Sequence, residues 1–496
     1  MNASRFQFQR QYVTAGFQKE IFVKKTRIRT LFLGRPKGDS FPGDENEEWP
    51  IYQGSFSHES LAARYREELK AYGRDVEFTG QTLVRTRGEL VDTAAKVQDE
   101  DGVLVFILGL FPNVMQKEIA SWGKPTVMFN PTEAPLSPLA WLHNFVPVKG
   151  KSNVIPVLSS DFADVGKKIG VLKAIHKMRQ SKVLYQQSHT PKQVESSRRW
   201  LEEGWGGIHL FSDLTPLSDG FIRQAKERLG LEIKDIPPQR LIAAYQNADA
   251  GAAEALAQSR IAGATDVVEP TREDVVESCK LYLGIKQILA EEGAQGITEH
   301  GICMGSGPYP LPCLAFSMLN DEGLAGICQL DLSSTITQLL IGYLADRPGF
   351  IGHIHIDTGR NLIGMSHDFS ATRLGGWDSE ESEEYAFRNH QGLYRSTCVN
   401  VQMEVGQTVT IAQYVPFDRM YVFTGVIDSN VNPQRDCRTS VAIRVADAKR
   451  LLRNCMKAEH PLTPGGHRLL FYGDWVDEIE DLGQLLGFEV VNDMEQ

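Results

Sequence analysis

The spacing of hydrophobic positions changes along the chain and divides it into three blocks. Over residues 24–180, continuous apolar runs alternate with segments of helical spacing, and Val103–Leu108, Val114–Trp122 and Pro125–Asn130 together predict a βαβ unit. Residues 181–345 repeat the alternation, and Thr271 is the expected cap of their strongest helix. From residue 346 to 496 the period becomes two, which is typical of antiparallel strands.

This pattern predicts two α/β domains, residues 24–180 and 181–345, followed by a mainly antiparallel β domain with flanking helices over residues 346–496. One flanking helix is expected at Val476–Leu486. Residues 1–23 are polar and aromatic without an apolar core, so we expect an N-terminal arm and no secretion signal.

Composition restricts the partners and the compartment. The 496 residues include 52 Lys and Arg against 63 Asp and Glu, a formal net charge of −11. An acidic surface repels phosphate backbones and anionic lipids, so we expect no nucleic acid and no membrane partner. The longest apolar run, residues 102–111, is too short for a membrane span of ~20 residues. Seven cysteines without a CxxC pair predict reduced thiols in a cytoplasmic protein.

Polar residues at predicted strand ends are the candidates for chemistry. Asp331 follows a short apolar strand in Cys-Gln-Leu-Asp, where a carboxylate could act as ligand or base, or could cap the helix expected over residues 333–345. His367 ends one apolar strand, directly before Asp368, and His467 begins another after two glycines. Each of these histidines, taken alone, would be expected to be structural.

Two further histidines, His353 and His355, alternate in IGHIHID and would share one face of a strand. Two histidines on one face can bind a metal, but half-exposed histidines without a nearby acid are more often bystanders. His390 lies in a polar segment beside Arg388, where a substrate contact is conceivable.

The common signatures of hydrolases, zinc proteases and nucleotide-binding enzymes are missing from the sequence. It contains no GxSxG, HExxH, Walker or GxGxxG motif. The remaining candidates are isolated carboxylates and imidazoles. Oxygen and nitrogen ligands without thiolate favour Mn²⁺ or Mg²⁺ over structural zinc.

Four segments resemble the L-fucose/L-arabinose isomerase superfamily, and most closely its uncharacterised L-fucose isomerase-like bacterial branch. They are PYPLPCLAFSMLNDEGLAGICQLDLSSTITQLLIGYLADRPGFIG, RNLIGMSHDFSATRL, CRTSVAIRV and GGHRLLFYGDWVDEIEDLGQLLGFEVV. The likeness is strong over about 270–496 and weaker over 25–180. It implies two Rossmann-like domains, a C-terminal β-rich domain that completes a site begun in residues 181–345, and a homotrimer or homohexamer.

Members of this superfamily interconvert an aldose and its ketose through a cis-enediol held by Mn²⁺ or another divalent cation. By resemblance, Asp331, His367 and His467 would be metal ligands, and Asp331 and Glu299 would supply acid and base catalysis. The substrate would be an unphosphorylated sugar. Its other contacts would come from Gln329, His390, Trp377 and Asn361, the last of which opens the segment that ends at His367.

Two departures from the family pattern leave a second function open. The family's Cys-Glu-x-Asp is Cys328-Gln329-Leu330-Asp331 here, and an amide cannot take up a proton near neutral pH. Glu299 is the only acid where the family places its first metal-binding Glu, and its register does not match cleanly. The sequence therefore predicts a metal-dependent sugar isomerase, with a catalytically inactive protein of the same fold, used in sugar sensing or scaffolding, as the alternative.

Overall fold

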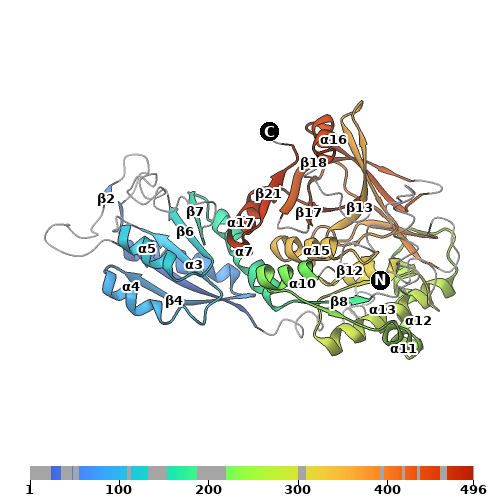
Figure 1. Ribbon diagram of the computed structural model, residues 1–496, viewed down its shortest axis with the longest axis horizontal. Helices are drawn as coiled ribbons and strands as arrows, with labels where there is room; N and C mark the ends of the chain where they lie inside the picture. The colour runs from blue at the N-terminus through green and yellow to red at the C-terminus, as the bar shows by residue number, and fades with distance from the viewer. Residues whose placement is uncertain are drawn as a thin grey trace, which may run out of the picture. The chain divides into compact units, whose positions relative to one another are not determined.

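In the computed structural model, the described residues are 24–34, 47–48, 55–108, 113–131, 153–186, 219–299, 309–390, 396–415, 419–432, 436–457 and 466–494. They belong to two compact units (Figure 1). The N-terminal unit comprises Val23–Lys177 and Asp477–Phe488, and the C-terminal unit comprises Met178–Val476 and Glu489–Gln496. The expected arm, residues 1–23, lies outside the described residues.

The two units divide the chain differently from the three expected blocks. Residues 181–345 and 346–476 form one unit, and the helix α17 (Val476–Leu486) belongs almost entirely to the N-terminal unit. Leu485 of this helix packs on that unit's core, and Gln484 donates a hydrogen bond to the carbonyl oxygen of Val154. The helix begins and ends where the sequence predicts. Its packing on a unit whose Val154 lies 330 residues earlier in the chain could not be predicted, because such long-range contacts leave no local sequence pattern.

The N-terminal unit is built on a five-stranded parallel sheet in the order β4-β1-β5-β6-β7. Its strands are β1 (Thr26–Leu33), β4 (Val76–Val84), β5 (Gly102–Ile107), β6 (Thr126–Pro131) and β7 (Val154–Ser159). Every residue of β5 and β6 is buried, as expected for central strands covered on both faces. The predicted α/β character of this region is therefore confirmed.

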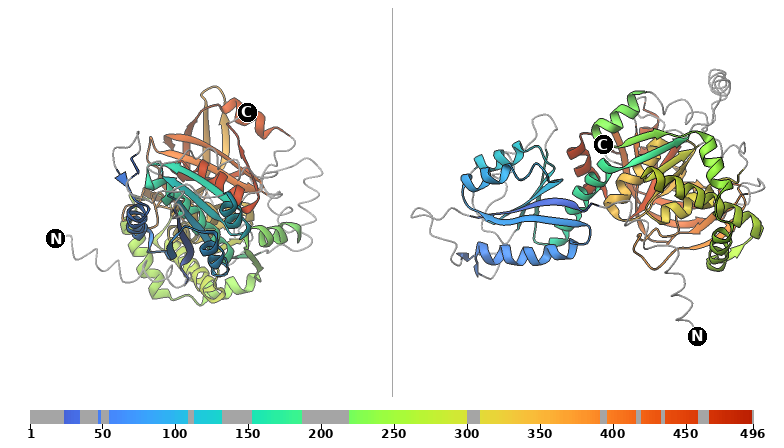
Figure 2. Two further views of the ribbon diagram at one scale, coloured as in Figure 1. Left: turned by 90° about the vertical axis from the view of Figure 1, so that its left-hand side faces the viewer. Right: turned by 90° about the horizontal axis from the view of Figure 1, so that it is seen from below.

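Helices cover both faces of this sheet (Figure 2). One face packs against α3 (His58–Leu69), α7 (Phe162–Gln180) and α17, with Tyr65 and Phe162 stacked near Phe106. The other face packs against α4 (Arg87–Ala94) and α5 (Asn113–Ser121). The short elements β2 (Glu47–Glu48), β3 (Ser55–Phe56) and η1 (Lys70–Tyr72) complete the described part of the unit.

A second parallel sheet, in the order β12-β11-β8-β9, begins the C-terminal unit. Its strands are β8 (Lys182–Gln186), β9 (Glu232–Asp235), β11 (Gly296–Glu299) and β12 (Ala325–Cys328). The accompanying helices are α10 (Asp219–Gln224), η2 (Ala225–Leu229), α11 (Pro238–Gln246), α12 (Ala250–Gly263), α13 (Arg272–Glu292) and α14 (Cys313–Asp321). Thr271 caps α13 as predicted and forms a capping box with Asp274.

The C-terminal strands close into a six-stranded antiparallel barrel in the order β17-β20-β13-β14-β19-β18, with β18 pairing back to β17. Its strands are β13 (Phe350–Asp357), β14 (Leu362–His367), β17 (Thr408–Val415), β18 (Arg419–Val431), β19 (Thr439–Val445) and β20 (His467–Tyr472). This confirms the predicted antiparallel block. Closure was not predicted, because polar and apolar residues alternate along a strand in the same way whether the sheet is open or closed into a barrel.

Smaller elements flank the barrel. Strand β21 (Glu489–Asn492) joins β18 in parallel, and β10 (Asp266–Val267), β15 (Glu384–Arg388) and β16 (Cys398–Gln402) form a separate three-stranded sheet. Helix α16 (Ala448–Cys455) buries Ala448 and Leu451. All residues of α15 (Leu332–Ala345) are buried, because this helix contacts β11 and β12 on one side and β17 and β20 of the barrel on the other.

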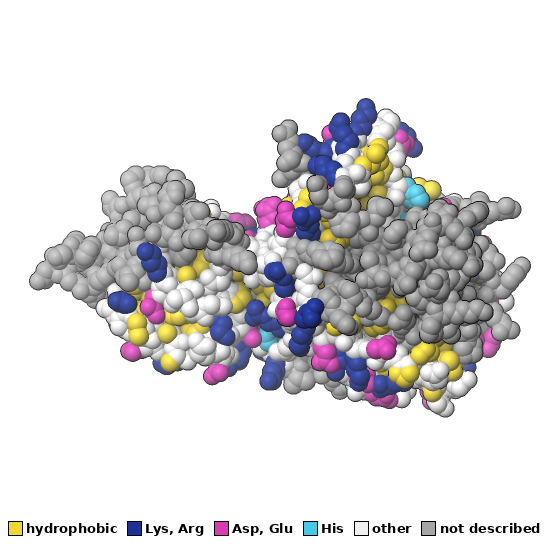
Figure 3. Space-filling model, viewed as in Figure 1, with side chains coloured by type: hydrophobic (Ala, Val, Ile, Leu, Met, Phe, Trp, Pro, Cys, Tyr) yellow, Lys and Arg dark blue, Asp and Glu magenta, His cyan; other side chains and the backbone are white. Residues whose placement is uncertain are grey.

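The face drawn in Figure 3 shows no extended patch of one charge on its described part. Acidic and basic side chains are mixed over its described part, with a small basic group over α16, which carries Lys449, Arg450 and Arg453. Among the described helices, none combines the length and the apolar composition that crossing a membrane requires.

The packing of α14 on β12 is tight enough to test by adding one methyl group. A Cβ at Gly326 would lie 2.7 Å from Cδ1 and 2.8 Å from Cα of the buried Phe316. We therefore expect Gly326→Ala to lower the free energy of unfolding by about 1–3 kcal/mol in chemical denaturation. At Gly375 a Cβ meets no described atom within 4 Å, so Gly375→Ala is the control, with a change within about 0.5 kcal/mol. Equal effects of the two variants would contradict this account.

Candidate metal centre

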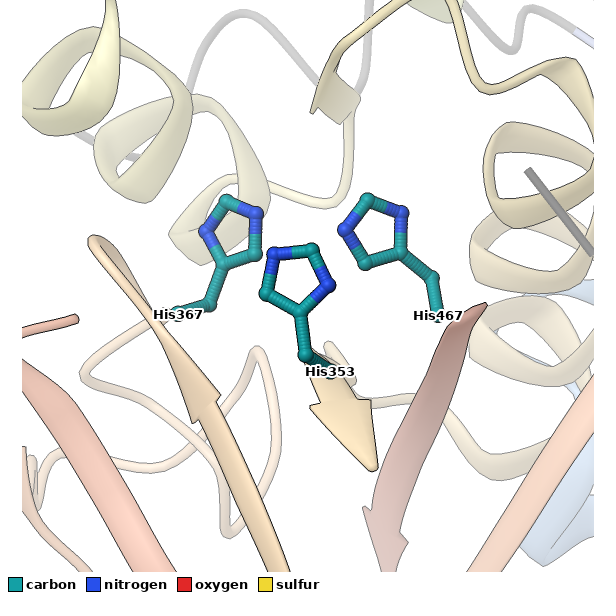
Figure 4. Close-up of side chains that lie close together, drawn as sticks. All are labelled: His353, His367 and His467. Carbon is teal, nitrogen blue, oxygen red and sulfur yellow. The ribbon is translucent and has the colours of Figure 1, made fainter. Parts of the chain in front are cut away.

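Three histidines from three neighbouring barrel strands face one another (Figure 4). His353 lies within β13, His367 ends β14 and His467 begins β20. The antiparallel register sets His353 directly opposite His467 on one side and opposite Ser366, the neighbour of His367, on the other. The ring centroid of His353 is 4.4 Å from that of His467 and 5.5 Å from that of His367.

The three rings satisfy the geometric requirement for one metal ion. Their candidate ligand atoms all lie within 4.8 Å of one another. Two imidazole nitrogens bound to one ion at about 2.1 Å each are separated by roughly 3–4 Å, so small side-chain rotations suffice. His467 and His367 are buried, while His353 is partly exposed. Three protein ligands with an open position are typical of catalytic metal sites.

Asp331 supports the cluster from behind His467. Its Oδ2 lies 2.9 Å from Nδ1 of His467, and both side chains are completely buried. As the N-cap of α15, Asp331 also accepts hydrogen bonds from the backbone N–H and the hydroxyl of Ser334. Burial raises the pKa of Asp331 to about 6, and the hydrogen bonds from Ser334 oppose this shift. A carboxylate that accepts from Nδ1–H fixes the ring so that Nε2 faces a metal.

The turn that carries Asp331 is locally strained. Gln329 and Leu330 have φ angles of 62° and 53°, in the left-handed region that residues with a Cβ rarely adopt. The Leu330 N–H donates to the carbonyl oxygen of Glu299, and Sγ of Cys328 lies 3.4 Å from Nε2 of His367. This turn therefore brings the end of the parallel sheet against the histidines of the barrel.

The other expected site residues occupy different places. Glu299 is fully buried at the end of β11, beside Cys328 in register. His390 pairs with Asp368, the residue after His367, with 3.0 Å between Nε2 and Oδ2. Trp377 and Asn361 are not brought to the cluster: Trp377 donates to the carbonyl oxygen of Asn320, and Asn361 bonds to backbone groups of Val445, Ala446 and Ala448 beyond the far end of β14.

The histidine cluster includes one residue that was not among the expected ligands, and one expected ligand lies behind it. His353 lies with His367 and His467, although a half-exposed histidine was expected to be a bystander. Asp331, expected as a direct ligand and as a catalytic group, has both carboxylate oxygens engaged in hydrogen bonds and lies behind His467. The alternation in IGHIHID was the signal for His353, but the long-range pairing of β13 with β20 was needed to use it.

The sequence matches no protein-family model, and no curated protein matches it. The resemblance to the L-fucose/L-arabinose isomerase superfamily therefore stays a prediction that depends on the quoted motifs.

Two histidines of β13 provide a matched pair for testing the cluster. His353 is one of the three facing rings, whereas Nε2 of His355 lies 3.3 Å from the hydroxyl of Ser366. We expect His353→Ala to lose at least about tenfold in affinity for Co²⁺ or Zn²⁺ by isothermal titration calorimetry, since one of three ligands is removed. His355→Ala should bind these ions as the wild type does. Equal losses in both variants would contradict the cluster.

Asp331→Asn separates the two roles of this side chain. Asn remains a good N-cap for α15, so thermal unfolding without metal should change little. The group that contacts Nδ1 of His467 becomes a neutral amide instead of a carboxylate, and we expect metal affinity to fall about 10–100-fold. Titration calorimetry and circular dichroism measure the two effects. Unchanged affinity would show that Asp331 serves the helix alone.

Proposed function

We propose that the chain is a metal-dependent aldose–ketose isomerase acting on an unphosphorylated sugar. The observation that carries the proposal is the convergence of His353, His367 and His467 from three barrel strands, with Asp331 behind His467. The sequence resemblance supplies the reaction class. The partial exposure of His353 supports access for a small molecule.

The three imidazoles would hold the cation, and Asp331 would position His467 instead of touching substrate. When bound, a divalent cation supplies Lewis acidity to the neighbouring carbonyl and hydroxyl oxygens of a sugar. The chain must then move one proton from C2 to C1 and a second from the hydroxyl oxygen on C2 to the carbonyl oxygen on C1. Glu299 is the proposed acid and base, because it is a buried carboxyl group on the strand next to Cys328, whose sulfur contacts His367. Gln329 remains neutral and is proposed to bind substrate.

The ligand set changes the preferred cation. Mn²⁺ was expected because carboxylates were expected as ligands, and Mn²⁺ favours oxygen. Three nitrogen ligands favour Co²⁺, Ni²⁺ or Zn²⁺ by the general order of affinities. We therefore propose that the site binds these ions more tightly than Mn²⁺, while Mn²⁺ remains the ion implied by the resemblance.

The expected location, domain type and oligomeric state remain part of the proposal. The six described cysteines are free thiols, which supports a reducing, cytoplasmic location. The two parallel sheets support the Rossmann-like domains of the resemblance, and a homotrimer or homohexamer is proposed on the resemblance alone.

The proposal is tested by metal analysis followed by a sugar panel. We expect about one divalent ion per chain, a lower melting temperature after chelation, and recovery on adding Co²⁺ or Mn²⁺. Incubation of the metal-loaded protein with unphosphorylated pentoses and hexoses should then produce ketoses. His353→Ala should abolish ketose formation and His355→Ala should retain it.

Two results would overturn the isomerase. The first is the absence of ketose at every metal concentration, with saturable sugar binding. This result favours the sugar-sensing alternative, which Gln329 supports because an amide replaces a carboxylate. The second is full turnover by Asp331→Asn together with His353→Ala, which would place the chemistry elsewhere.

A further inference from the structure

The amide of Gln186 is buried and has, among the described residues, none of the hydrogen bonds that such a group normally requires. Gln186 ends strand β8 and is 0% exposed. Neither its Nε2 nor its Oε1 has a hydrogen-bond partner among the described residues. A primary amide offers two donors and one acceptor oxygen, and leaving them unpaired in a protein interior is costly. A polar ligand at this position would remove that cost.

The strand register relates Gln186 to the proposed catalytic residues. Gln186 lies beside Glu299, and Glu299 lies beside Cys328, so three neighbouring parallel strands end in one row. Residues in register on parallel strands direct their side chains to the same face of the sheet. Cys328 contacts His367 of the metal cluster, so this shared face is the one toward the cluster. Gln186 is two strand spacings from Cys328, about 10 Å.

We propose that Gln186 binds a hydroxyl group of a neutral polyol chain at the end remote from the metal cluster. This inference rests on the proposed function for the ligand class, and it adds a residue that sets the length and stereochemistry of the sugar. A hydroxyl both donates and accepts, which matches the amide. The row also contains the carboxyl group of Glu299, which disfavours a phosphate at this position.

A second amide lies at the other end of the row. Gln329 follows Cys328, is 9% exposed, and its Oε1 has no partner in the described part of the chain. Cys328 and Gln186 therefore flank Glu299 along the strand ends, and Gln329 begins the turn that follows Cys328. An open-chain sugar laid along this row would place its reacting end near Cys328 and the histidines, and its last hydroxyls near Gln186.

The test compares ligand binding with stability in the same variant. Gln186→Leu removes unpaired buried polar atoms, so the ligand-free protein should be as stable as wild type or melt at a higher temperature. Its metal content should be unchanged. Its affinity for L-arabinitol and L-fucitol, measured by calorimetry on the metal-loaded protein, should fall at least about tenfold. Binding of erythritol, which is shorter, should be affected less.

Gln295→Leu is the matched control. Gln295 is also a buried amide, but it directly precedes β11, at the opposite end of the strands, where its Oε1 accepts from the Lys182 N–H and its Nε2 donates to the Gly293 carbonyl oxygen. Its replacement should lower the melting temperature and leave polyol affinity unchanged. A ligand-binding amide is thus recognised by a loss of polyol affinity without a loss of melting temperature, and a structural amide by the reverse.

Three outcomes would overturn the role of Gln186. These are wild-type polyol affinity in Gln186→Leu, no polyol binding by metal-loaded wild type, or failure of both Gln186→Leu and Gln186→Met to fold. The last outcome would show that the amide is structural. Failure of the proposed function is seen separately, as the absence of bound metal or of ketose formation in the wild type.

Discussion

The carboxylate of Asp331 is the interaction on which the C-terminal unit depends, because it joins the parallel sheet, α15 and the barrel at one buried point. It follows β12, caps α15 and accepts from His467 of β20. A buried carboxylate is tolerated only when its oxygens are satisfied, and here Ser334 and His467 satisfy both. The same group thus begins a helix and orients an imidazole, so the fold and the candidate site share one constraint.

The arrangement of the site follows from two sheet geometries that meet at α15. Parallel strands bring their carboxyl ends to one edge, which sets Gln186, Glu299 and Cys328 in a row. Antiparallel register then fixes the histidines on neighbouring barrel strands. Backbone pairing therefore determines the spacing of the polar groups. The strained pair Gln329 and Leu330 lies in the short turn that links β12 to α15.

Local sequence was sufficient for much of the fold and for part of the site. The cap at Thr271, the helix Val476–Leu486 and the strand that begins at His467 follow from capping chemistry and periodicity. Pairing between distant strands has no such signal. For this reason the approach of His353 to His367 and His467 was not predicted, and Asn361, whose side chain bonds to the carbonyl oxygen of Val445, was expected at the site. Barrel closure and the return of α17 also escaped prediction.

Closure of the barrel also restricts how copies of the chain can associate. A sheet edge carries unpaired N–H and C=O groups that invite another strand, and a closed ring removes them. Among the described strands, β4 and β7 end one sheet, and β9 and β12 end another, whereas each of the six barrel strands is paired on both sides. Contacts through the wall of these six strands are therefore left mainly to side chains, and the backbone edge that remains on this sheet among the described strands is that of β21, beside β18.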